Sequence, residues 1–138
     1  MAKAFAKIRA AAIDGRCLNP IFRKTQLQRL HQALSQNAPE IQASMARDTS
    51  HLQAEVTAEF LLSMRLLADT YNELDPDKAL KEEYAVAKGL DVADGREPVG
   101  IVLIRPAVTG HAFFFGLMSA LVPALAAGNC IVVQVSFG

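Results

Sequence analysis

The chain carries no formal charge after Arg105, over about its last quarter, and this feature limits most strongly what the chain can fold into. Two short continuous apolar runs, at residues 99–104 and 131–135, are typical of strands that are buried on both faces. Between them, residues 112–127 are apolar on almost every side at helical spacing, and Gly128 is placed to end that helix. This order of elements predicts one right-handed βαβ unit with two adjacent parallel strands.

The residues before this unit predict helices. Asn19 followed by Pro20 is typical of an N-cap with proline at the first helical position. Ser50 and Gln53 fit a capping box that opens a long helix, and the Asp-Pro pair at residues 75–76 ends it. Two shorter helical patterns flank the long one, beginning near residue 39 and covering residues 77–88.

The polar, turn-rich stretch at residues 91–98 is the one boundary that the sequence offers. We therefore expect an α/β fold in a single domain over residues 1–138, in which a helical part (1–90) packs on a βαβ part (99–136). A two-stranded parallel sheet leaves two open edges, and parallel sheets normally have helices over both faces. Either the helices wrap this unit or another chain completes the sheet, which predicts self-association or docking onto a partner.

Composition excludes several classes of function. Hydrophobic residues make up 51% of the chain, so it is not a disordered protein. Fourteen basic and fourteen acidic side chains give a net charge of zero, and the sequence contains no nucleic-acid-binding module, which argues against nucleic-acid binding. The uncharged stretch at residues 113–127 is shorter than the roughly 20 residues that a membrane span needs, so no membrane segment is expected.

The two cysteines, Cys17 and Cys130, are too few for a disulfide scaffold, and neither lies in a CxxC pair. The N-terminal residues have no continuous apolar core, so a secretory signal is not expected. We therefore expect a reduced, cytoplasmic location. The basic, Ala-rich stretch at residues 2–12 leaves a mitochondrial presequence open as an alternative to a helix with a solvated basic face.

Most chemical motifs are absent from the sequence, including GxGxxG, GxxxxGK[ST], HExxH and GxSxG. His31, His51 and His111 have no cysteine or carboxylate at metal-ligand spacing, so no metal site is expected. Glu55 and Glu59 lie one helical turn apart, where they could form a carboxylate pair or a solvated helix face.

The turn between the first predicted strand and the apolar helix is the best candidate site. Thr109 and His111 lie there, where the helix N-terminus supplies backbone N–H donors and a partial positive charge. His111 could transfer protons and Thr109 could help to bind a developing negative charge, or His111 could simply cap the helix or lie in an interface. An apolar pocket for a hydrophobic small molecule would be lined by Val108, Phe113, Phe114, Phe115 and Met118.

Several segments resemble the aldehyde dehydrogenase family over about residues 5–136, most specifically at residues 98–100 and 124–129. Residues 97–104 and 123–133 look like the first βαβ unit of that family's cofactor domain. Upstream, the chain resembles that family's N-terminal helices in the same order, at residues 22–34, at residues 37–48 and in the long helix. Among the members of the family, the sequence resembles fungal ones most. The resemblance implies an incomplete aldehyde dehydrogenase cofactor domain.

The resemblance also implies what this chain lacks. Family members are much longer, and their nucleophilic cysteine and general-base glutamate lie in parts that this chain does not have; neither cysteine here matches the nucleophile's motif. Gln134 and Phe137 stand where the family usually places the lysine and glutamate that hold the cofactor's ribose. The oxyanion asparagine of the family is also replaced, by Thr109 or His111 depending on where the loop is gapped. No cofactor is therefore expected for this chain.

These observations predict a truncated aldehyde dehydrogenase-like protein that has been recruited as a small cofactor-free enzyme. It would catalyse an isomerase- or cyclase-type proton transfer on a hydrophobic small molecule, for example in biosynthesis. The alternative is a non-catalytic regulatory or scaffold subunit that docks on a full-length aldehyde dehydrogenase-like protein. The expected partners are the small molecule and either further copies of this chain, in a homo-oligomer, or a longer relative, in a hetero-complex.

Overall fold

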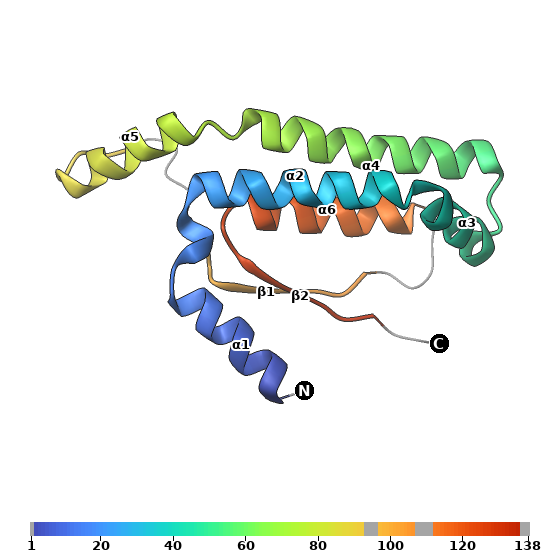
Figure 1. Cartoon of the computed structure of the whole chain (residues 1–138), viewed down its shortest axis with the longest axis horizontal. Helices are drawn as coiled ribbons and strands as arrows, with labels where there is room; N and C mark the ends of the chain where they lie inside the picture. The colour runs from blue at the N-terminus through green and yellow to red at the C-terminus, as the bar shows by residue number, and fades with distance from the viewer. Residues whose placement is uncertain (1, 93–96, 107–111, 136–138) are drawn as a thin grey trace.

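The computed structural model describes residues 2–92, 97–106 and 112–135 and confirms an α/β fold with one βαβ unit (Figure 1). Strands β1 and β2 pair in parallel, with Ile101 opposite Cys130 and Ile104 opposite Val133. The elements in chain order are α1 (Ala2–Ile13), the 3-10 helix η1 (Arg16–Leu18), α2 (Pro20–Gln36), α3 (Ala38–Thr49), α4 (Gln53–Glu73), α5 (Pro76–Ala87), β1 (Ile101–Ile104), α6 (Phe113–Ala126) and β2 (Cys130–Val133).

Helices cover both faces of the small sheet. α6 contacts β1 and β2 on one side, and α1 contacts the same two strands from the other side (Figure 1). α2 and α4 lie against the side of α6 that faces away from the sheet, so the molecule is built in layers. Within the described residues, no helix is both long and apolar enough to cross a membrane.

The core lies mainly between helices rather than on the sheet. Its first cluster joins α2, α4 and α6 through Leu27, Leu67, Met118 and Val122. A second cluster joins α3 and α4 through Met45, Val56, Phe60 and Met64. α4 contributes to both clusters, and Phe114 of α6 and Leu34 of α2 each pack against both, so these three helices connect the two halves of the core.

The predicted start of α2 is confirmed, whereas the predicted start of α4 is wrong. The Asn19 side chain accepts hydrogen bonds from the N–H groups of Ile21 and Phe22, at 2.9 and 3.2 Å. Ser50 does not cap α4, because its left-handed backbone (φ 56°) ends α3 instead. α4 begins after Leu52, and Glu55 supplies half of a capping box by accepting from the Leu52 N–H at 2.9 Å.

The turn from α6 into β2 positions the two strands. Gly128 (φ 91°) ends the helix as predicted, with its N–H donating to the carbonyl of Leu125. The Asn129 side chain is buried; its oxygen accepts from the Gly100 N–H at 3.0 Å and its amide donates to the carbonyl of Ala124 at 3.1 Å. Asn129 therefore ties the end of α6 to the residue before β1, which sets the two strands side by side.

Candidate functional site

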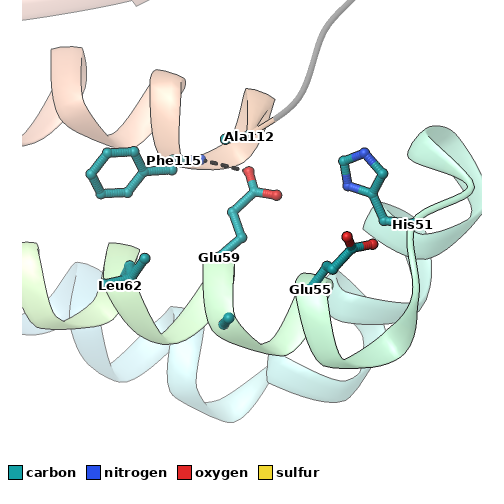
Figure 2. A pocket seen from close by; sticks show the side chains of 7 residues that line it. His51, Glu55, Glu59, Leu62, Ala112 and Phe115 are labelled. Atoms are coloured by element: carbon teal, nitrogen blue, oxygen red, sulfur yellow. Dashed lines mark hydrogen bonds between the residues drawn. The ribbon is translucent and has the colours of Figure 1, made fainter.

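An open depression of about 300 Å³ lies between α4 and the N-terminus of α6 (Figure 2). Ala112 and Phe115, at the start of α6, line one side of it, and residues of α4 and the segment before it line the other. The residues that line it are His51, Glu55, Ala58, Glu59, Leu62, Ala112 and Phe115.

Glu59 is the structural centre of this depression. Its side chain comes from α4 and is 8% exposed, and its Oε1 accepts a hydrogen bond from the Phe115 N–H at 2.9 Å (Figure 2). Phe115 is the third residue of α6, so its N–H is one of the groups that a helix cannot satisfy internally. The N-cap position itself is Ala112, which has no side-chain acceptor. Glu59 therefore caps α6 from a neighbouring helix and places a carboxylate at the positive end of its dipole.

This capping predicts that Glu59→Ala lowers the free energy of unfolding by about 1–3 kcal/mol, because a buried N–H loses its acceptor. Glu59→Gln keeps a neutral acceptor of similar size and is expected to lose less than half as much. Urea denaturation followed by circular dichroism measures both values. Equal losses for the two variants would contradict the capping role, because Gln keeps both the volume and a hydrogen-bond acceptor, and would assign the effect to the charge of the carboxylate.

Two further titratable side chains share the depression with Glu59. Figure 2 shows the imidazole of His51 and the carboxylate of Glu55 beside it, both next to Glu59. Leu62 and Phe115 supply an apolar wall on the other side. An imidazole and two carboxylates next to an apolar surface are groups that can exchange protons with a bound molecule. His51 is not among the residues that the sequence predicts for the site, and because it lies before the first residue of α4, no helical spacing links it to Glu55.

The residues that the sequence predicts for the site lie in different parts of the structure or outside the described residues. Thr109, His111 and Val108 lie outside the described residues. Phe115 lines the depression and Phe113 is half-buried at the start of α6. Phe114 stacks on Phe60 with ring centroids 5.9 Å apart, and Met118 is buried in the cluster between α2, α4 and α6. The structure thus brings Phe115 to the depression and uses Phe114 and Met118 in the core, while the role of each toward a substrate stays a prediction.

The carboxyl ends of β1 and β2 carry a polar pair of their own. The Arg105 Nε donates to the Gln134 Oε1 at 2.8 Å, and the Gln134 N–H donates to the carbonyl of Ile104. Gln134 stands where the family resemblance implies a lysine that contacts the cofactor. Its neutral amide, held by Arg105, does not fit that role, and Phe137, at the implied glutamate position, lies outside the described residues. Among the residues described, no group of three or more His, Cys, Asp and Glu side chains could hold a metal ion.

The fold and this site define an α/β protein in which helices enclose a single βαβ unit. The profile of the aldehyde dehydrogenase family matches residues 1–137, and the chain belongs to that family. It is 34% identical to aldehyde dehydrogenase family 3 member B1 of Mus musculus over 140 residues, which is 94% of this chain and 28% of that protein. The chain therefore spans less than a third of the length of this relative. The comparison with solved structures finds no match.

Proposed function

We propose that this chain is a non-catalytic subunit that docks on a longer aldehyde dehydrogenase-like protein by extending its sheet. The observation that supports the proposal is the two-stranded sheet. In the part of the chain that the structure describes, β1 and β2 are the only strands, so each has an outer edge with no strand beside it. α1 and α6 pack on the two faces, whereas strands pair along the edges, so these edges are the places for further pairing.

The exposed side chains at the sheet support the same proposal. Leu103 of β1 is 52% exposed although it lies in a strand that carries only apolar residues. A partner strand beside β1 or β2 would remove such side chains from water. The apolar residues exposed in the two strands or next to them are Val99, Leu103, Val133 and Val135.

The positions of the two cysteines also favour a docking role over dehydrogenation by this chain. Oxidation of an aldehyde through a covalent intermediate needs a nucleophilic thiolate at the substrate site. Cys17 and Cys130 lie at the β2 end of α6, whereas the depression lies at its N-terminus, about 20 Å away along 14 helical residues. The chemistry of the complex would therefore come from the longer protein.

The test mixes the purified chain with a longer aldehyde dehydrogenase-like protein of the same organism and measures the complex by native mass spectrometry. We expect a discrete hetero-complex, and we expect Leu103→Glu to weaken it by at least about tenfold, because a charge at an open sheet edge opposes strand pairing. Leu61→Glu is the matched control, since Leu61 is a similarly exposed leucine on α4 (59%). No complex with the unmodified chain, or equal weakening by both variants, would overturn the proposal.

A second candidate function is proton transfer on a hydrophobic small molecule by a homo-oligomer of this chain. The observation that favours it is the depression, where His51, Glu55 and Glu59 meet the apolar side chains of Leu62 and Phe115. In this function His111 would act as the acid or base, and Thr109 would bind developing negative charge.

This second function predicts that the purified oligomer retains a hydrophobic molecule from a cell extract and converts it. His111→Ala is expected to abolish the conversion without changing the circular dichroism spectrum. Turnover that is unchanged in His111→Ala would remove His111 from the mechanism, and an oligomer that retains no small molecule would remove the function itself.

A further inference from the structure

We propose that Cys17 and Cys130 form a reversible disulfide that ties the N-terminal helices to the start of β2. Their Sγ atoms lie 3.7 Å apart, although the residues are 113 positions apart in the sequence, and both side chains are half-buried. Sulfur atoms in a disulfide are about 2 Å apart, so the bond needs a sulfur movement of less than about 2 Å. This proposal is independent of the proposed function.

Backbone contacts hold Cys17 and Cys130 close together, independently of any bond between their sulfur atoms. η1, which carries Cys17, lies so close to the α6–β2 turn that a Cβ on Gly128 would be 2.8 Å from the Cys17 carbonyl oxygen. Cys130 is fixed on the other side, since its N–H donates to the Gly100 carbonyl at 2.8 Å and its residue pairs with Ile101 in the sheet. Both cysteines are therefore held in position before any bond forms.

A side chain from α2 closes the same junction. Arg23 donates through Nη1 to the carbonyl of Ala126 at 2.8 Å, which caps the C-terminus of α6 with a cation. Burial lowers the pKa of Arg23, and the Arg23 Cδ would lie 3.5 Å from a Cβ on Gly128. The turn between α6 and β2 is thus held by η1 and α2 together, and this limits how far Cys17 and Cys130 can separate.

The oxidation is a thiol–disulfide exchange with a low-molecular-weight disulfide such as oxidised glutathione. One cysteine thiolate attacks a sulfur of oxidised glutathione, which releases one glutathione thiolate and leaves a mixed disulfide on the protein. The second cysteine thiolate then attacks the protein sulfur of that mixed disulfide and releases the second glutathione thiolate. Two protein thiols are oxidised, one oxidised glutathione is reduced to two thiols, and the two protons pass to the released glutathiones.

The surroundings of Cys17 set the pH dependence of this exchange. Burial raises the pKa of the Cys17 thiol, and the hydrogen bond and charge of Cys130 and the carboxylate of Asp14 raise it further, while Arg16 opposes them. The positive Arg23 also faces this thiol from α2. A raised pKa leaves less thiolate at neutral pH, so bridging is slow there and becomes faster as the pH rises.

The experiment equilibrates the reduced protein with mixtures of reduced and oxidised glutathione, quenches with acid and counts free thiols by alkylation and mass spectrometry. We expect both thiols to disappear together and a digest to yield one peptide pair joined at Cys17 and Cys130. The equilibrium constant for bridging is expected to be at least about 100-fold larger for the folded chain than for the same chain in concentrated urea. Cys17→Ser and Cys130→Ser should each leave one thiol that takes up no more than one glutathione.

Three results would overturn the proposal. Separate mixed disulfides at either cysteine with no joined peptide would show that the thiols do not reach each other. Equal equilibrium constants in buffer and in urea would show that the fold does not bring the thiols together. Disulfide-linked dimers in place of the internal bridge would also show that the fold does not bring the two thiols of one chain together. Because peptide mapping of the unmodified protein decides the outcome, the test holds even where a serine variant fails to fold.

Discussion

Leu67→Ala is expected to lower the free energy of unfolding by about 3–4 kcal/mol. Leu67 lies in α4, is fully buried (0% exposed) and contacts the cluster that holds α2 and α6. Removing its side chain takes away contacts to the two other helices of the cluster and leaves a cavity between the three. Domains of this size have a total stability of about 5–15 kcal/mol, so the variant would lose a large part of it.

The control for Leu67→Ala is Leu61→Ala in the same helix. Leu61 has the same side chain and the same secondary structure but is largely exposed, so its substitution is expected to change the stability by less than about 0.5 kcal/mol. Urea denaturation of both variants, with equal slopes, gives the comparison. A loss at Leu67 that is no larger than the loss at Leu61 would mean that the α2–α4–α6 cluster is not the core of the protein.

The βαβ unit could be predicted because its signals are local. The two strands and the helix between them each have their own spacing of apolar residues, and neighbouring residues in the sequence define that spacing. Gly128 marks the end of the helix because glycine readily takes a positive φ. The strands were predicted slightly too long at the start of β1 and the end of β2. Gly100, with φ 103°, precedes the first paired residue of β1, so Val99 lies outside the strand.

The remaining features of the site depend on residues that are far apart in sequence. Glu59 caps a helix that begins 54 positions later, and neither end of that contact has a local signal for the other. The Cys17–Cys130 pair arises because η1 approaches the turn after α6, which no spacing rule describes. The predicted Ser50–Gln53 capping box is wrong for a local reason, because Ser50 takes the left-handed conformation that ends α3 and so cannot open the next helix.

Gly128→Ala is the second large effect, with an expected loss of about 3 kcal/mol in the free energy of unfolding. An alanine there would adopt φ 91°, which is strained for any residue with a Cβ, at a cost of about 1–2 kcal/mol. Its Cβ would also meet the Cys17 carbonyl oxygen at 2.8 Å, and because that atom is backbone, η1 itself has to move. The displacement is expected to slow the bridging of Cys17 and Cys130 as well.

Substitutions at two other glycines distinguish the two causes of the stability loss in Gly128→Ala, which are backbone strain and the close contact with η1. Gly89 also has a positive φ (75°) but nothing within 4 Å of an added Cβ, so Gly89→Ala is expected to lose only about 1 kcal/mol from backbone strain. Gly116 lies within α6 with open space around it, so Gly116→Ala should raise the stability by about 0.5–1 kcal/mol. Thermal and urea denaturation of the three variants should give this order. If Gly128→Ala lost no more than Gly89→Ala, the close approach of η1 to the α6–β2 turn would be absent in solution, and the two thiols would have no reason to meet.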